Sequence, residues 1–394
     1  MTRITRSIGP ARVARRIALL PLLLGVIGCA VAQPSAGPTV VATETVQVEV
    51  AEIARGLEFP WGLAFMPDGR MLVTERAGRL RIVGRDGALS PPIEGVPAVR
   101  TGGQGGLLDV ALSPGFAQDR TVFLSYAEPT ELGGRTAVAR GVLDGTTLRE
   151  VRPIFRQAPD APGGYHWGAR LAFGRDGTLF VTLGDRFSLR DRAQDLGTHL
   201  GKVVRIRPDG SVPEDNPFAK RAGALPEIWS YGHRNVQGAA VHPTTGRLWT
   251  HEHGPQGGDE LNLVEPGKNY GWPVVGRGLA YGAGTPIHQS ITLEGMEDPE
   301  YFWVPSIAAS GLIVYNGSQF PLWNGSIIAG GLAGEQLARL TMTEDGLGVS
   351  TEETLLHHLG RIRDVRQGPD GFIYVALEDR SRAPTAIVRL EPAE

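Results

Sequence analysis

The sequence predicts an all-β protein, a six-bladed β-propeller. Its 394 residues include 54 Gly and 29 Pro, and 21% are charged, which favours short strands joined by many turns. Asp-Gly or Thr-Gly between two apolar runs indicates a hairpin, because glycine accepts the positive φ of the turn. Such units, spaced about 45–70 residues apart, match propeller blades. They occupy residues 62–75, 109–128, 170–185, 238–253, 311–331 and 364–379.

Other all-β and α/β architectures fit the pattern less well. A β-sandwich would need shorter and more even spacing between its strands. A TIM barrel would need regular helices between the strands, and the sequence has no such helical periodicity.

The first 29 residues have the pattern of an export signal. Arg15 and Arg16 precede an apolar run over residues 17–27, which is too short to span a bilayer as a mature helix. The run ends in Val-Ile-Gly-Cys, which is similar to a bacterial lipobox with Cys29 as the acylated residue. Alternatively, the small residues 30–32 form a cleavage site that leaves a soluble protein. Both endings predict an exported protein, either periplasmic or held at a membrane as a lipoprotein.

A flexible tether and a closing strand are expected next. Residues 30–44 are mostly small, contain Pro and show no strand or helix pattern. Val46, Val48 and Val50 then alternate with polar residues, as in a half-buried strand. We expect this strand to pair with residues 386–392 and close the ring, so that residues 45–394 form one propeller domain.

The charge balance limits the kinds of partner. The formal net charge is −3, but the first 29 residues carry five Arg and no acid. Without those five Arg, 34 basic and 42 acidic side chains remain, which gives the rest of the chain a net charge of 34 − 42 = −8. Nucleic-acid binders present basic faces, so this mildly acidic body argues against nucleic acid. An anionic ligand must therefore be held by a local cluster of arginines. Cys29 is the single cysteine, which excludes an intramolecular disulfide.

A histidine and an aspartate bracket the third hairpin. His166 stands just before its first strand, and Asp185 follows its second strand. The two ends of a hairpin meet on one face, so these side chains are expected to lie close together. A carboxylate beside an imidazole selects its tautomer and supports it as a general base. The alternative is a structural histidine, and the sequence leaves both open.

Polar donors stand at equivalent places before other blades. Arg234 and Asn235 precede the fourth hairpin, Arg361 and Arg363 precede the sixth, and Gln104 precedes the second. Such residues can be a solvated face. In an acidic protein, their gathering at blade entrances instead indicates a pocket for a ligand with several carboxylates, which the arginine fork matches.

The run HEHGPQGGDE (251–260) has the composition of a calcium site. Gly254 and Pro255 offer two consecutive carbonyls, and Asp259 and Glu260 add carboxylates. Hard oxygen ligands select Ca²⁺, whereas HExxH or CxxC motifs for zinc are absent from the sequence. A capped loop with a solvated acid pair is the alternative reading.

Taken in order, the motifs resemble the soluble quinoprotein glucose/sorbosone dehydrogenase family, and within it the aldose sugar dehydrogenases. The likeness runs from about residue 57 to residue 389. It rests on PWGLAF, GQGGLLDVALSPGF, HWGARLAF, GDR, GHRNVQG, HGPQGGDELN, GKNYGWP, PSIAASG and RIRDV. The family fold is a six-bladed propeller that holds pyrroloquinoline quinone (PQQ) and Ca²⁺ at the channel mouth.

The resemblance implies a role for each candidate residue. His166 matches the catalytic base and Asp185 its supporting acid, while Arg234 steadies charge on the quinone oxygen. Contacts to PQQ are implied for Gln104, Arg234, Asn235, Arg361, Arg363 and Trp303. The resemblance implies that the carbonyls of Gly254 and Pro255 ligate the cofactor's Ca²⁺. It implies that Glu260 and the Tyr270 carbonyl ligate a second, structural Ca²⁺.

The chemistry implied by the resemblance is the oxidation of an aldose at C1 to its lactone. His166 would take the proton of the anomeric hydroxyl while hydride leaves C1 for the quinone, and electrons then pass to an external acceptor. Three positions depart from the family pattern. Ala333 stands near the place of a cofactor-contacting Lys in some relatives, His253 replaces Gln, and Ala309 replaces Pro.

Two other functions remain open from the sequence. One is a calcium-dependent six-bladed lactonase or related hydrolase, which would have no need of Arg361 and Arg363. The other is a propeller that binds sugars or partners without catalysis, which the absent Lys makes conceivable. The identity of the sugar is not encoded in a readable pattern.

Overall fold

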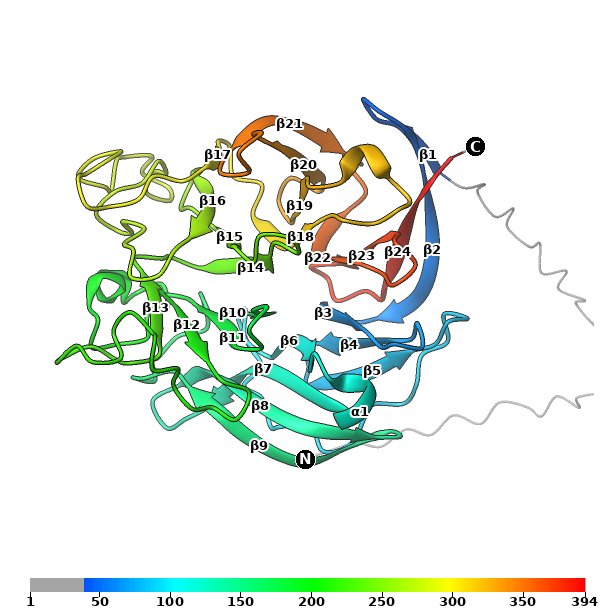
Figure 1. Ribbon diagram of the computed structural model, residues 1–394, viewed down its shortest axis with the longest axis horizontal. Helices are drawn as coiled ribbons and strands as arrows, with labels where there is room; N and C mark the ends of the chain where they lie inside the picture. Colours follow the sequence, from blue (N-terminus) through cyan, green and yellow to red (C-terminus); the bar gives the residue numbers. More distant parts are fainter. Residues whose placement is uncertain (1–38, 394) are drawn as a thin grey trace, which may run out of the picture. The chain divides into compact units, whose positions relative to one another are not determined.

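The chain folds into a six-bladed β-propeller, as the sequence predicts. The computed structural model describes residues 39–393. Its strands form six antiparallel sheets arranged in a ring (Figure 1). The innermost strands of neighbouring blades contact one another around the ring, so the functional loops of all six blades start near one axis.

Five blades are continuous in sequence. The first blade is β3 (Pro60–Phe65), β4 (Met71–Glu75) and β5 (Arg79–Val83); the second is β6 (Leu107–Leu112), β7 (Thr121–Pro129), β8 (Gly134–Asp144) and β9 (Thr147–Arg156); the third is β10 (Gly168–Phe173), β11 (Leu179–Leu183), β12 (Lys202–Ile206) and β13 (Ile228–Tyr231). The fourth is β14 (Val236–Val241), β15 (Leu248–Glu252), β16 (Asp259–Val264) and β17 (Tyr301–Trp303); the fifth is β18 (Ala309–Val314), β19 (Ile327–Gly331), β20 (Leu337–Met342) and β21 (Val349–Leu355).

The sixth blade joins the two ends of the propeller. It contains β22 (Arg361–Gln367), β23 (Ile373–Glu378), β24 (Thr385–Pro392), β2 (Gln47–Leu57) and β1 (Thr39–Ala42). The antiparallel register of β2 with β24 confirms the predicted ring closure. The tether expected over residues 30–44 is corrected at its end, because residues 39–42 pair with β2 as strand β1. The predicted signal, Cys29 and the alternative cleavage site lie outside the described residues.

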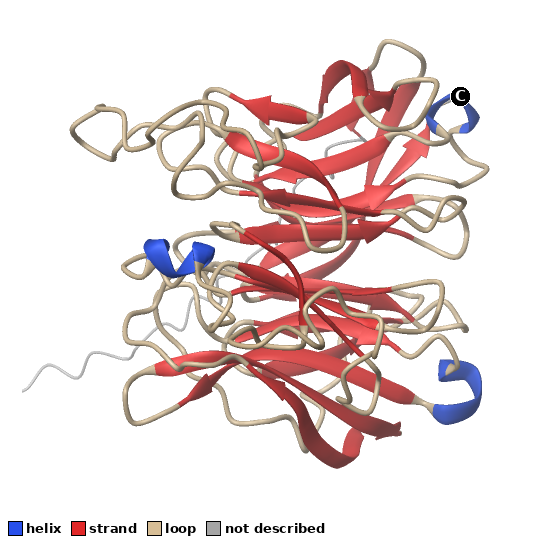
Figure 2. Ribbon diagram, turned by 60° about the vertical axis from the view of Figure 1, so that its left-hand side comes forward, coloured by secondary structure: helices blue, strands red, loops and turns tan. Residues whose placement is uncertain are grey.

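Among residues 39–393, helices are few and short. They are α1 (Phe116–Asp119), η1 (Arg190–Gln194) and η2 (Pro321–Trp323). Figure 2 shows them in the loops at the ends of the strands, while the strands fill the body of the ring. None of the helices within residues 39–393 has the length and apolar character needed to span a membrane.

The six recurring units of the sequence are the two inner strands of each blade. In every inner hairpin the register shifts near the start of the first strand, which marks a β-bulge. Bulges re-aim side chains and occur beside active sites. Here they fall at the starts of β3, β6, β10, β14, β18 and β22, next to the residues that the sequence analysis places at blade entrances.

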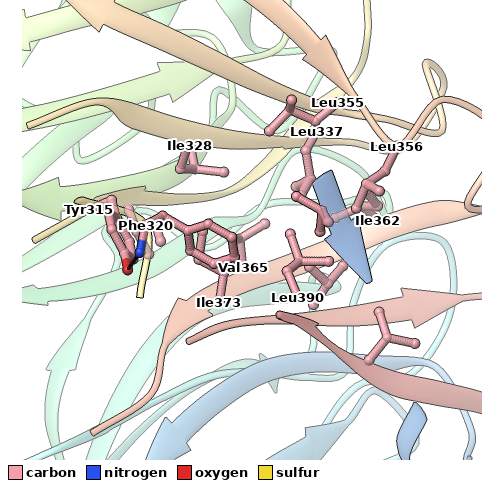
Figure 3. Packing of buried hydrophobic residues seen from close by; sticks show 14 of the residues in the cluster. Tyr315, Phe320, Ile328, Leu337, Leu355, Leu356, Ile362, Val365, Ile373 and Leu390 are labelled. Atoms are coloured by element: carbon pink, nitrogen blue, oxygen red, sulfur yellow. Dashed lines mark hydrogen bonds between the residues drawn. The ribbon is translucent and has the colours of Figure 1, made fainter. Parts of the chain in front are cut away.

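Apolar side chains of adjacent blades pack face to face between the sheets. Figure 3 shows the cluster between the fifth and sixth blades, where Ile328 and Leu337 meet Ile362, Val365 and Ile373. All five are completely buried. This packing is rigid enough to hold loop residues from different blades at constant separations.

A buried charge cluster fills the centre of the ring. Arg170 of β10 lies 3.0 Å from both Asp109 of β6 and Asp364 of β22, and Arg366 lies 3.1 Å from Asp109. Asp109 also occupies the space that a side chain at Gly62 of β3 would need, 2.5 Å from the ideal Cβ. The cluster therefore ties the first, second, third and sixth blades together.

Replacing Arg170 with methionine is expected to lower the free energy of unfolding by about 3–5 kcal/mol, because two buried carboxylates lose their partner. Urea denaturation measures the loss. Arg149→Met is the control, since Arg149 forms only an exposed pair with Asp144 and such pairs contribute about 0–1 kcal/mol. Equal losses in the two variants would contradict the assigned role, and adding Asp109→Asn and Asp364→Asn to Arg170→Met should restore part of the stability.

Candidate active site

The ends of the inner hairpins assemble one polar site. Gln104, His166, Arg234 and Asn235 precede their innermost strands, and Arg361 begins one. In an antiparallel hairpin the end of the second strand lies beside the start of the first, as in the pairing of Arg361 with Glu378. The structure thus brings together at one end of the ring the residues that the sequence analysis placed at blade entrances.

His166 and Asp185 form a hydrogen-bonded pair. Nδ1 of His166 lies 2.6 Å from Oδ1 of Asp185, and both side chains are buried. Oδ2 of Asp185 accepts a hydrogen bond from Nε1 of Trp272 at 2.8 Å, and Oδ1 accepts one from the backbone N–H of Phe187 at 2.7 Å. Because the carboxylate only accepts, Nδ1 of His166 carries the proton and Nε2 is left basic.

Burial lowers the pKa of His166, and the hydrogen bond to Asp185 opposes that shift. The imidazole is therefore neutral near pH 7, the state in which Nε2 can accept a proton. The imidazole is thus deprotonated, oriented by a carboxylate and packed edge-on against the Phe187 ring 5.2 Å away, as a general base requires.

The backbone around the pair is strained. Positive φ angles occur at His166 (51°), Ala169 (84°), Arg186 (60°) and Phe187 (65°). Non-glycine residues in this region cost about 1–3 kcal/mol each and persist where the surrounding structure holds them. Arg186 supplies part of that restraint: its guanidinium lies 3.3 Å from the Trp167 ring centroid and donates to the Tyr165 carbonyl at 3.1 Å.

Gly184 leaves room for the His166 backbone, since an ideal Cβ at this position would lie 2.1 Å from the His166 carbonyl oxygen. We expect Gly184→Ala to displace His166 and lower kcat on the order of 10²-fold, the effect of about 1 Å of misplacement. Gly115→Ala is the control, because its Cβ would make only ordinary contacts from 3.4 Å outward. An unchanged kcat with intact thermal stability would show that Gly184 does not position the base.

A cavity of about 350 Å³ lies at the axis and is rich in cations. Its charged lining consists of Arg76, Arg361, Arg363, Arg380 and Glu378. Arg361 and Arg363 each place a guanidinium nitrogen 2.8 Å from Glu378. Burial alone would raise the pKa of Glu378, but the two arginines outweigh it and hold that pKa at about 2. Four arginines against one carboxylate leave excess positive charge for an anionic ligand.

Gln104 and Asn235 connect this cavity to the histidine. Gln104 Oε1 accepts the backbone N–H of His166 at 2.8 Å, and Asn235 Oδ1 accepts that of Gly168 at 3.2 Å. The Nδ2 atom of Asn235 and Nε of Arg234 are buried without a hydrogen-bond partner. An acceptor supplied by a bound ligand would satisfy both donors.

A second chamber of about 400 Å³ lies on the other side of His166. His166, Asp185 and Arg234 line it together with the aromatic residues Phe187 and Tyr281, both of which are exposed. A polar base beside exposed aromatic faces suits a polyhydroxylated ligand, which offers both hydroxyls and apolar C–H faces.

A small cavity of about 10 Å³ lies among oxygen-rich groups near Arg234. A cavity of this volume has room for one ion or one water. Gly254, Pro255, Glu260 and Tyr270 line it, and the structure adds Glu252. Burial and the neighbouring Glu252 carboxylate raise the pKa of Glu260 to about 8. Two carboxylates that destabilise each other across a cavity of this size would be stabilised by a cation. Asp259 faces elsewhere, because its carboxylate accepts from Gly254 N and Ser306 Oγ.

Comparison with known proteins decides the family. Residues 57–388 match the family model described as Glucose / Sorbosone dehydrogenase. The chain belongs to this family. It is 44% identical over 346 residues to Aldose sugar dehydrogenase YliI of Escherichia coli (strain K12). The matched region covers 86% of this chain and 92% of that protein. It is 26% identical over 406 residues to Quinoprotein glucose dehydrogenase B of Acinetobacter calcoaceticus, covering 83% and 84%.

Solved structures agree with the family assignment. The soluble aldose sugar dehydrogenase (Asd) of Escherichia coli in the apo-form superposes with a TM-score of 0.83 at 41% identity, covering 88% of this chain and all of the other. The PQQ-bound aldose sugar dehydrogenase (Adh) of Streptomyces coelicolor gives a TM-score of 0.72 at 30% identity, covering 89% and 99%. This glucose/sorbosone dehydrogenase family member is therefore an oxidoreductase acting on sugar CH–OH groups.

One residue expected at the cofactor is placed elsewhere in this dehydrogenase. Trp303 packs between the fourth and fifth blades with Trp249, is 4% exposed, and donates from Nε1 to Glu352 at 3.0 Å. Its place in the outermost strand of the fourth blade keeps it out of the central cavity, so the prediction of a cofactor contact is corrected. Trp61 and Trp167 line the cavity instead.

The sequence analysis also missed partners of the predicted residues. Trp272 stands 87 residues from Asp185 along the chain, and Glu378 ends an apolar strand just before the polar residues 379–382, which the analysis did not single out. For Arg186 the only signal in the sequence was the motif GDR. Glu252 stands inside the run HEHGPQGGDE (251–260) but was not singled out. Ala333 does line the cavity, so the side chain that departs from the family pattern faces the site.

Proposed function

We propose that this dehydrogenase oxidises aldose sugars at C1 to the lactone, using PQQ and Ca²⁺ and passing the electrons to an external acceptor. The observation that carries the proposal is that two chambers meet at His166: Gln104, which lines one chamber, accepts the backbone N–H of His166, which lines the other. One has an excess of arginines for an anionic cofactor, and the other holds a buried, neutral His166 oriented by Asp185. The PQQ-bound Streptomyces coelicolor relative and the quinoprotein relative support PQQ as that cofactor.

The residues present fit PQQ and Ca²⁺. Arg361 and Arg363 would hold carboxylates of PQQ, which has three. The unpaired donors of Asn235 and Arg234 lie outside the lining of that cavity, the first behind Gly168 and the second in the chamber of His166. Oxygen ligands for the cofactor's Ca²⁺ would come from the carbonyls of Gly254 and Pro255, and those for a second Ca²⁺ from Glu260 and the Tyr270 carbonyl. When bound, PQQ supplies an ortho-quinone that accepts two electrons, and Ca²⁺ polarises its carbonyl as a Lewis acid.

His166 acts as the general base in this proposal. Its Nε2 takes the proton of the anomeric hydroxyl, because Nδ1 is committed to Asp185 and cannot accept it. Asp185 stabilises the imidazolium that forms, and Trp272 with the Phe187 backbone holds that carboxylate in place. Arg234 donates to the carbonyl of His253 at 2.9 Å and lines the chamber of His166, so its guanidinium is held in place and would stabilise negative charge that develops during the reaction.

Reconstitution tests the proposal. Purified protein is titrated with PQQ in the presence of Ca²⁺, binding is followed by absorbance, and dye reduction is measured with glucose and other aldoses. We expect reduction that needs PQQ, Ca²⁺ and sugar together and that a chelator abolishes reversibly. Absence of PQQ binding at micromolar cofactor would refute the proposal, whereas binding without sugar-dependent reduction would refute only the reaction.

Export is a separate proposal. The pattern of residues 1–29 supports removal of a signal, with lipidation of Cys29 or simple secretion as the two endings. The mass of the mature protein from cell fractions tests it, since an unprocessed chain in the cytoplasmic fraction would contradict export.

A further inference from the structure

A third chamber adjoins the cofactor cavity and has no assigned role. We call it the arginine annex and define it by Phe59, Arg76, Arg380, Arg382 and the glycine-rich loop 101–105. Its volume is about 610 Å³, and it shares Phe59, Arg76 and Arg380 with the cofactor cavity. A ligand in the annex would therefore lie directly beside a ligand in that cavity.

The annex carries uncompensated positive charge. Among residues 39–393, no carboxylate lies within ion-pair distance of Arg76, Arg380 or Arg382. Arg76 donates instead to the carbonyls of Gly103 and Gly105. The single carboxylate in the lining, Glu58, is paired with Arg79 at 2.8 Å.

Two of the three guanidinium groups share one aromatic ring against their mutual repulsion. Arg76 lies 4.9 Å and Arg382 6.0 Å from the centroid of the Phe59 ring. Burial and then the nearby Arg363 lower the pKa of Arg76 to about 10. Clustering like charges is unfavourable unless an anion is bound for part of the time, so the arrangement points to a ligand more than to stability.

The annex is separate from the chamber that contains the catalytic base. None of its lining residues belongs to the chamber of His166, Asp185 and Arg234. The cofactor cavity has residues in common with the annex, whereas the base chamber does not. A molecule in the annex could thus receive electrons without displacing a sugar beside His166.

We propose that the arginine annex binds the electron acceptor and selects one that is anionic. The inference rests on the proposed function. Oxidation of an aldose at C1 to the lactone releases two electrons and two protons; the electrons leave through the cofactor to the acceptor, and the protons pass to solvent. With ferricyanide as acceptor, two ions each take one electron and become ferrocyanide. Arg380 and Arg382 attract the anion, and Phe59 offers a flat apolar face to acceptors with a ring.

The first test compares acceptors of opposite charge. Arg382→Gln is used because Arg382 lines only the annex and is exposed. We expect KM for ferricyanide to rise about tenfold, the loss of one charge-assisted contact, while KM for the N-methylphenazinium cation stays level or falls. KM for the sugar and the Kd of PQQ should not change. Arg221→Gln is the matched control, since Arg221 is also exposed and lies 5.6 Å from a phenylalanine ring, that of Phe218.

The second test does not depend on turnover. Ferrocyanide, which cannot accept an electron, is titrated calorimetrically into protein free of PQQ. If ferrocyanide binds wild type and Arg382→Gln weakens that binding, the annex is supported as an anion site. This result would hold even without the proposed dehydrogenase activity, and only the acceptor role would then be refuted. Equal ferricyanide KM values in wild type and Arg382→Gln, or a weakened Kd for PQQ in that variant, would overturn the proposal.

Discussion

Changing Asp185 to asparagine is expected to lower kcat of the reconstituted enzyme about 10³-fold, within the range for loss of a positioned general base. An amide at this position can donate to Nδ1 of His166, which would favour the tautomer with the proton on Nε2. That tautomer cannot take the proton of a sugar hydroxyl. His166→Ala removes the base itself and should cost as much, and the double variant should be no worse than either single one, because residues that act as a unit are not additive.

The pH profile separates this role from a structural one. The neutral imidazole is the active form, so kcat/KM should fall as the pH falls through the pKa of His166. Burial places that pKa below its ordinary value of 6.5. The hydrogen bond to Asp185 raises the pKa of His166. In Asp185→Asn this effect is lost, so the acidic limb of any residual activity should shift to still lower pH.

A matched control exists in the same blade. His199 and Glu227 form a similar pair, with Nε2 and the carboxylate 3.3 Å apart, but outside all three chambers. Glu227→Gln should leave kcat and the pH profile unchanged. A loss of kcat in Glu227→Gln equal to that in Asp185→Asn would mean that both act through stability.

Replacing Arg361 and Arg363 together with glutamine is expected to weaken the Kd of PQQ by a factor of about 10² or more, two charge-assisted contacts at about 1.5 kcal/mol each. The direct measurement is absorbance titration of PQQ, which does not require turnover. A lactonase would keep its hydrolytic activity in this variant, so the same protein preparation also tests the alternative function.

The variant needs a companion because Glu378 would be left buried without its partners. The pKa of Glu378, held at about 2 in the folded protein against an ordinary 4.5, marks a carboxylate that stabilises the fold above pH 4.5 and loses that contribution as the pH falls toward 2. The triple variant with Glu378→Gln removes this cost. If the triple variant melts like wild type and still binds PQQ with an unchanged Kd, the arginines do not hold the cofactor.

The positions of the candidate residues could be predicted because they depend on local pattern. Apolar runs around Asp-Gly turns specify the inner hairpins, and the two ends of a hairpin must meet, which places Asp185 beside His166. The same logic applies to Arg361, which pairs with Glu378 at the open end of the sixth hairpin, although the sequence analysis did not single out Glu378.

Other contacts could not be predicted because they join blades that are far apart in sequence. Trp272 reaches Asp185 from the loop that follows the fourth blade's third strand, and Arg170 meets Asp109 and Asp364 only when the ring closes. Trp303 was misplaced for the same reason: a tryptophan near a polar motif fits a cofactor contact or an interblade core equally well until its strand is located.

By itself, then, the sequence determined the number of blades, the strand that closes the ring and the residues that stand at each entrance, since turn chemistry and alternation act over a few residues. Only the tertiary structure decided that these entrances divide into separate chambers, that the arginines share one carboxylate, and that a further group of arginines lies beside them. These features depend on distances between blades, and such distances are set by the packing of the closed ring.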